Sequence, residues 1–165
     1  ALHWIIAILV VTNITLASIS VDLPRAAKAA YMNPHKAIGV SILLLSLFRL
    51  FRRLGHKPPP MPDAVTGWQA KLGKTVHALF YFLSIAVPLT GWLMVAARPG
   101  APPLDFFGLF SLDLPVGDSK ALSEFGHEGH EILTKPLVIL IMLHVIGALK
   151  HQFADRVPFI QRMWP

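Results

Sequence analysis

The sequence predicts an all-α integral membrane protein, a four-helix bundle, from three observations. Only 15% of its 165 residues are charged, whereas about a quarter of a soluble domain is charged. The apolar residues gather into four runs, each close to the about 20 residues that cross a bilayer. No cysteine is present, which excludes a disulfide scaffold, a thiolate metal site and an iron–sulfur cluster.

The first two runs lie in the N-terminal third of the chain. Residues 2–20 are uncharged apart from His3 at the start. Residues 35–52 contain Arg49 near their end, so this segment spans only if the arginine side chain extends toward the lipid headgroups. We expect both runs to be membrane helices.

The other two runs lie in the C-terminal half. Residues 75–97 form the clearest span, because they contain no Asp, Glu or Lys. Residues 130–150 contain Lys135 and form the weakest span. A helix that starts near Ile132, projects above the membrane and bends at Pro136 would explain this pattern.

Three connections separate the spans. Residues 21–33 make the first and 52–74 the second, which contains a Lys-Pro-Pro-Pro-Met-Pro stretch at 57–62. This stretch is expected to be extended, because consecutive prolines exclude a helix. The third connection, 98–128, is longer and mostly acidic. Without an internal repeat or a second globular region, residues 1–165 are expected to form one domain.

Lys and Arg favour the cytoplasmic side of membrane proteins, and their distribution predicts the orientation. Both termini and the Pro-rich connection are expected in the cytoplasm, in a bacterial inner membrane. The formal net charge of +6 then reflects topology, and no basic stripe with interleaved aromatics suggests nucleic acid binding. Nine Lys and Arg residues lie on the predicted inner side: Arg49, Arg52, Arg53, Lys57, Lys71, Lys74, Lys150, Arg156 and Arg162. Six lie on the predicted outer side: Arg25, Lys28, Lys36, Arg98, Lys120 and Lys135.

Most of the eight histidines lie at the ends of the spans. Ionisable groups at membrane depth are costly and suggest a function, although one such histidine is more often a satisfied interfacial residue. The predicted topology places four of them toward the cytoplasm: His3, His77, His144 and His151. It places three toward the outside: His35, His127 and His130.

The spacing of the histidines in the last span is more specific. His130 and His144 are 14 residues apart, which puts them within about 40° of one helix face and about 21 Å apart along the axis. His127 falls on nearly the opposite face from His144, whereas His151 returns to the face of His144. Two stacked histidines predict two cofactors, one near each membrane surface, each with a second ligand from another helix.

Haem suits this arrangement, because its iron takes two imidazoles on opposite sides and its macrocycle fills a bundle interior. Without cysteine the haem must be non-covalent b-type. His35 can supply the outer second ligand, and His3 or His77 the inner one. Gly39 and Gly147 either leave space for a flat ring or allow close helix packing.

Two further sets of residues have alternative explanations. Four cations on the predicted inner side either pair with haem propionates or fix the orientation of the chain in the membrane: Arg49, Arg52, Arg53 and Lys74. A rival hypothesis places zinc or copper on the Gly-His-Glu-Gly-His-Glu motif at 126–131, which leaves His144 and His35 without a role.

Several motifs together resemble the bacterial cytochrome b561 family over nearly the whole chain. They are His3-Trp4, Asn33-Pro34-His35-Lys36-Ala37-Ile38-Gly39, Arg49-Leu50, the Pro-rich connection, Pro88-Leu89-Thr90-Gly91, His130-Glu131, His144 and His151. The resemblance implies a four-helix inner-membrane bundle with two stacked b haems. It implies His3 with His144 as axial ligands on the cytoplasmic side, and His35 with His130 on the periplasmic side.

The resemblance also implies a function. Members of the family pass electrons between the periplasmic face and the quinone pool, and at least one type oxidises superoxide while it reduces ubiquinone. A quinone site would then lie near the cytoplasmic haem, at His151 with His77 and Lys74. Outer cations such as Arg25 and Arg98 either attract an anionic donor or are simply solvated.

Two alternative functions stay open at this point. One is a haem-b membrane anchor subunit that passes electrons for a partner dehydrogenase or hydrogenase. The other is a metal-handling membrane protein that uses His127 and His130.

Overall fold

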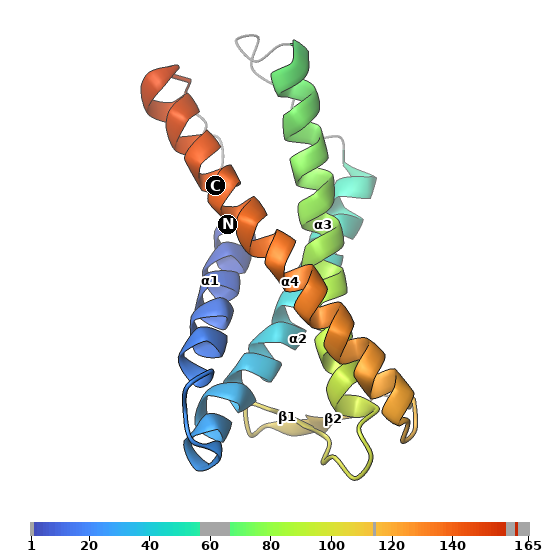
Figure 1. Cartoon of the computed structure of the whole chain (residues 1–165). Helices are drawn as coiled ribbons and strands as arrows, with labels where there is room; N and C mark the ends of the chain where they lie inside the picture. The colour runs from blue at the N-terminus through green and yellow to red at the C-terminus, as the bar shows by residue number, and fades with distance from the viewer. Residues whose placement is uncertain (1, 57–66, 114, 158–160, 162–165) are drawn as a thin grey trace.

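The computed structural model describes residues 2–56, 67–113, 115–157 and 161. Most of these residues are helical, as predicted (Figure 1). The elements, in chain order, are α1 (Leu2–Ser20), α2 (Arg25–Gly55), α3 (Gly67–Ala96), β1 (Leu104–Phe106), β2 (Phe110–Leu112), α4 (Lys120–Leu149) and the π-helical turn η1 (Lys150–Ala154).

Within the described residues, three helical segments are long and apolar enough to cross a membrane: α1, α3 and α4 together with η1. Their apolar side chains face outward; Ile8 and Phe82, for example, are 64% and 58% exposed. Water solvates such apolar surfaces poorly, so these three segments are candidate membrane spans, in agreement with the prediction. α2 is 31 residues long, but its Lys and Arg residues lower its hydropathy, and its crossing stays a prediction.

The predicted first connection, 21–33, is wrong over most of its length. α2 begins at Arg25, directly after Pro24, so only residues 21–24 link α1 to α2. The error arises because an apolar run marks the lipid-crossing part of a helix rather than the whole helix. Alanine and lysine between 25 and 30 are good helix formers, and they extend α2 before the apolar run.

The same effect corrects the starts of the last two spans. α3 begins at Gly67 and α4 at Lys120, so the parts of the predicted connections at 67–74 and 120–128 are helical. The Ser119 hydroxyl caps α4 by accepting from the Leu122 N–H at 3.3 Å, and the predicted start near Ile132 is wrong. The stretch at 57–62, predicted to be extended, lies outside the described residues, as does Arg162.

The helices pack in sequence order, α1 on α2, α2 on α3 and α3 on α4. Gly126 allows the closest approach, because a Cβ atom there would lie 2.6 Å from the Met94 backbone N. The buried core joins α3 and α4 through Leu83, Val87, Leu137, Phe80, Leu133, Leu140 and Ile141. Leu137 lies midway along α4 between His130 and His144, so an apolar layer separates the levels of these two histidines.

A small antiparallel hairpin, which was not predicted, interrupts the all-α architecture. β1 and β2 pair with Leu104 opposite Leu112 and Phe106 opposite Phe110. Its loop needs positive φ angles at Phe107 and Gly108 (54° and 73°), and glycine adopts this conformation without strain. The hairpin lies at the end of the bundle where α3 ends and α4 begins (Figure 1).

Candidate functional site

Five of the predicted site histidines meet in two groups from different helices. His144 of α4 lies between His3 of α1 and His77 of α3, with ring centroids 6.4 Å and 6.1 Å away. We call these three residues the His144 cluster. His35 of α2 faces His130 of α4, with ring centroids 6.3 Å apart. We call these two residues the His130 pair.

These separations fit two imidazoles that share one metal ion. A metal–imidazole bond is about 2 Å long, so the centres of two rings on opposite sides of a metal lie about 6 Å apart. The rings of the His130 pair are nearly perpendicular, at 89°, and those of His3 and His144 are at 75°. Each arrangement brings two imidazoles from two helices together, and such a pair could hold the iron of a haem.

The alternative metal reading receives no support from the described residues, which contain no group of three or more His, Asp or Glu side chains placed to hold a metal ion. Zinc needs three or four protein ligands. His127 is exposed, and its Nδ1 contacts the Met94 Sδ at 3.2 Å. Like His130, His127 contacts α3, but the two histidines contact different residues of that helix.

Backbone carbonyls orient both rings of the His130 pair. The Nδ1 of His35 lies 3.1 Å from the Asn13 O, and the Nδ1 of His130 lies 2.8 Å from the Val87 O. A carbonyl only accepts hydrogen bonds, so each Nδ1 carries the proton and donates. The lone pair is then on Nε2, which is the tautomer that a metal-binding histidine needs.

Gly91 makes the space for the His130 ring. A Cβ atom at this position would lie 2.9 Å from the His130 Nδ1 and 3.0 Å from its Cε1. Residues 88–91 entered the sequence analysis only through the family resemblance, and nothing in their composition showed this contact. The surroundings of His130 therefore come from α3 as well as from its ligand partner on α2.

The two glycines singled out from the sequence do not serve close packing. A Cβ atom at Gly147 would meet nothing within 4 Å, and one at Gly39 would make an ordinary contact of 3.8 Å with the Asn13 Nδ2. Close packing occurs instead at Gly126, against the backbone of Met94.

Two arginines of α2 surround the His144 cluster. The Arg49 Nη1 lies 3.4 Å from the His3 Nδ1. The guanidinium groups of Arg49 and Arg53 each lie 5.6 Å from the centre of the Tyr81 ring on α3. Guanidinium groups bind carboxylates through paired N–H donors, so both arginines are suited to the propionates of a haem at this level.

Exposure separates His77 from the other members of these groups. His3, His35, His130 and His144 are half-buried, whereas His77 is exposed. Lys74 is exposed as well, three residues before His77 on α3. This pattern favours His3 as the partner of His144, and it leaves His77 and Lys74 at the surface of the same end of the bundle.

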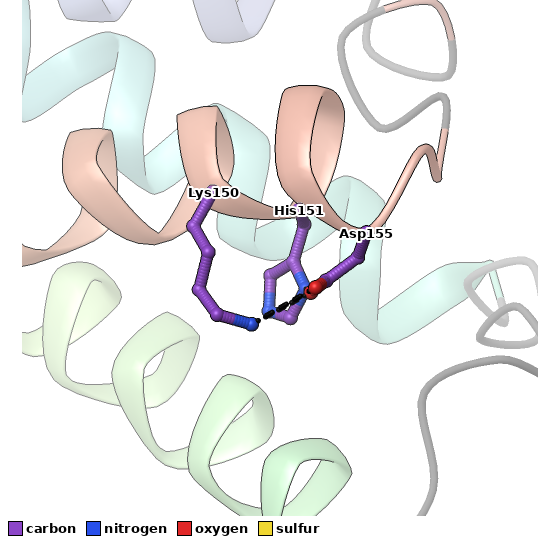
Figure 2. A network of polar contacts seen from close by, with 3 residues as sticks. All are labelled: Lys150, His151 and Asp155. Carbon is purple, nitrogen blue, oxygen red and sulfur yellow. Dashed lines mark hydrogen bonds and ion pairs between the residues drawn. The ribbon is translucent and has the colours of Figure 1, made fainter.

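His151 lies beyond the end of α4, in η1 (Figure 2). Its Nδ1 donates to the Asp155 Oδ2 at 2.6 Å, and the Lys150 Nζ donates to the same oxygen at 2.8 Å. These hydrogen bonds, above all that from Lys150, hold the pKa of Asp155 below its usual range. Asp155 was missed from the sequence, although an acid four residues after a histidine on a helix was a usable signal.

Known proteins resemble this chain over nearly its whole length. The family model for prokaryotic cytochrome b561 matches residues 1–165. Cytochrome b561 homolog 2 of Escherichia coli (strain K12) is 30% identical over 99% of this chain and 87% of its own length. The "Probable superoxide oxidase CybB" of Yersinia pestis is 24% identical over 99% of this chain and 92% of its own length. The chain therefore belongs to the prokaryotic cytochrome b561 family, whose members are haem b proteins of membrane electron transfer.

Proposed function

We propose that the protein carries electrons across the bacterial inner membrane by means of two haem b groups and delivers them to the quinone pool. The observation that supports this most is the pairing of His130 with His35 and of His144 with His3 at matching ring separations of 6.3 Å and 6.4 Å. His130 and His144 are about 21 Å apart on one continuous helix. This spacing puts one pair near each surface of a bilayer core of about 30 Å.

The residues of each site have distinct tasks. His35 with His130, and His3 with His144, would hold the two groups, and haem supplies one-electron redox chemistry when it is bound. The carbonyls of Asn13 and Val87 hold the His130 pair in one orientation. Arg49 and Arg53 would hold the propionates at the His144 cluster, and the buried core of α3 and α4 excludes water between the two levels.

The proposed topology has four crossings, with α2 as the fourth span and both termini in the cytoplasm. Its support is the unequal distribution of Lys and Arg between the two sides. Arg49, Arg52 and Arg53 near the C-terminal end of α2 would then reach the cytoplasmic headgroups. This orientation places the His144 cluster and His151 on the cytoplasmic side.

The proposed acceptor is ubiquinone, bound at the cytoplasmic end near His151, His77 and Lys74. Conversion of a quinone into a quinol takes up two electrons and two protons. Imidazole is the side chain best suited to exchange protons near neutral pH. The exposed positions of His77 and Lys74, beside the half-buried His144, suit a site that a membrane-dissolved quinone reaches.

The proposed donor is superoxide at the opposite end of the bundle. Oxidation of two superoxide ions to two molecules of oxygen releases the two electrons that one quinone needs. Arg25, Lys28 and Arg98 are exposed at that end, and clustered cations raise the local concentration of an anionic substrate. A relative named for superoxide oxidase activity supports this choice at 24% identity.

A reduced-minus-oxidised absorption spectrum of the purified protein, with haem quantification, tests the proposal. Two haems per chain are expected, and a colourless protein from haem-replete cells or one haem per chain would refute it. His3→Ala should lose the cytoplasmic-side haem and His77→Ala should keep both; the reverse result would make His77 the ligand. Superoxide oxidation with ubiquinone should need no partner, since a requirement for one would indicate an anchor subunit.

A further inference from the structure

The chain leaves α4 through a π-helical turn, η1, rather than through an ordinary helix end. The Asp155 N–H donates to the Lys150 O at 3.1 Å, the five-residue spacing of a π-turn. The N–H of the buried Val157 donates to the His151 O at 2.9 Å and closes the turn. π-helical turns are rare in proteins, and those that do occur are frequently found at functional sites.

The π-turn brings together side chains that an α-helix would separate. On an α-helix, residues five apart differ by about 140° around the axis, so Lys150 and Asp155 would point in different directions. In η1 the Lys150 Nζ lies 2.8 Å from the Asp155 Oδ2 and 3.1 Å from its Oδ1. The His151 Nδ1 lies 2.6 Å from the same Oδ2, and Figure 2 shows both groups converging on the carboxylate.

This contact fixes the tautomer of His151. An ionised carboxylate only accepts hydrogen bonds, so the His151 Nδ1 carries a proton and donates it to the bond. Nε2 is then the nitrogen at which the ring takes up and releases a proton. The carboxylate thereby orients the ring, as the aspartate orients the histidine in serine hydrolases.

The three side chains also form a graded path toward solvent. The relative exposure of the side chain rises from 23% at His151 to 35% at Asp155 and 55% at Lys150. His151 is seven residues after His144, or about 10 Å along the axis. The network thus runs from His151, the least exposed of the three side chains, to Lys150, the most exposed.

We propose that Asp155 is a positioning residue that orients His151 for proton transfer to a quinone, and that Lys150 holds the carboxylate in place. This inference rests on the proposed function, in which a quinone is reduced at this end of the bundle. One quinone, two superoxide ions and two protons give one quinol and two molecules of oxygen. Each proton passes from the His151 Nε2 to a quinone oxygen, and water then reprotonates the ring.

The test uses the full-length holoprotein, with superoxide as the donor and a short-chain ubiquinone as the probe. Asp155→Asn keeps the size of the side chain and removes its charge. We expect unchanged haem content, haem potentials and quinone KM, with a kcat that falls about 10- to 100-fold and a larger solvent deuterium isotope effect. Asp155→Glu should restore part of the rate, because it returns a carboxylate. A merely structural role would not raise the isotope effect.

The matched control is Glu124→Gln. Glu124 forms an exposed contact of 3.7 Å with Lys120 in the first turns of the same helix, so its loss removes a comparable acidic group far from His151. This variant should keep the wild-type kcat. If Glu124→Gln lowers kcat as much as Asp155→Asn does, the effect is one of general charge and the inference is wrong.

A double variant shows whether Asp155 acts through His151. His151→Asn should be slow, and the addition of Asp155→Asn should lower its rate no further. A second, equal loss in the double variant would overturn the inference, and so would a wild-type kcat for Asp155→Asn alone. If Asp155→Asn fails to fold, Lys150→Met takes its place. We expect this variant to lower kcat by a smaller factor, and a wild-type kcat would overturn the inference. Failure of the wild-type protein to reduce quinone overturns the proposed function instead.

Discussion

Substitution of Gly91 by alanine is the sharpest test of the His130 pair. The new Cβ atom would lie 2.9 Å from the His130 Nδ1, and ordinary van der Waals contact begins at 3.4 Å, so the ring must move by about 0.5 Å. Binding sites tolerate displacements of about this size at most. The movement also disturbs the 2.8 Å hydrogen bond to the Val87 O, and loss of such a supporting bond lowers metal affinity about 10- to 100-fold.

Gly91→Ala should therefore lose most of the haem at the His130 pair and keep the haem at the His144 cluster. The measurement is haem content per chain, followed by a redox titration that resolves the two haems by potential. Gly55→Ala is the matched control, because a Cβ atom there would meet nothing within 4 Å. It should keep two haems per chain.

Two results would refute this reasoning. If Gly91→Ala retains both haems at wild-type potentials, the His130 ring either does not occupy the observed position or is not a ligand. If Gly91→Ala loses both haems together, the substitution acts on the fold rather than on one ring. If Gly91→Ala loses only the haem at the His144 cluster, the two haems identified by their potentials have been assigned to the wrong sites.

Three further predictions follow from other contacts. His130→Ala should lose the outer haem and His127→Ala should not, as measured by haem content; the opposite result would contradict the assignment of helix faces. Gly126→Ala should lower the free energy of unfolding by about 1–3 kcal/mol, measured by denaturation in detergent, because its Cβ would lie 2.6 Å from the Met94 backbone. The pKa of Asp155 is lowered on folding, so its contribution to η1 is complete above the usual aspartate value of about 3.9 and is lost as the pH falls through the lower folded value. The protection factors of the η1 amides, which compare their exchange rates with those of the unfolded chain at the same pH, should accordingly stay constant from pH 7 to about 4 and fall below that; a fall between pH 7 and 5 would contradict this.

The positions of the histidines were predictable from the sequence because helix geometry is regular. The 14 residues between His130 and His144 set a common face, and α4 is continuous over that interval. The exclusion of His127 from the face of His144 followed from the same angle and stays a prediction. The pairing of His130 with His35 was also expected, since both lie at the same end of their helices.

The parts that the sequence did not predict depend on contacts between helices or on local backbone geometry. Gly91 looks like any glycine until the ring of His130 is placed against it. The π-turn of η1 breaks the regular periodicity on which the helix-face reasoning depends, so the approach of Lys150 to Asp155 was not foreseeable. Helix starts were misplaced because hydropathy marks contact with lipid, whereas capping and helix propensity decide where a helix begins.

The proposed arrangement of ligands would give haem a structural as well as a redox task. α4 supplies one histidine to each site, and the partners come from α1 at His3 and from α2 at His35. α1 packs on α2 rather than on α4, so a metal shared by His3 and His144 would tie together two helices that pack little against each other. Any group that binds only the folded state stabilises it. Haem at the His144 cluster should thus hold α1 against the bundle, whereas haem at the His130 pair joins helices already linked through α3. If both proposed sites bind haem, their contributions to the stability of the fold should therefore differ, with the larger share from the cluster that contains His3.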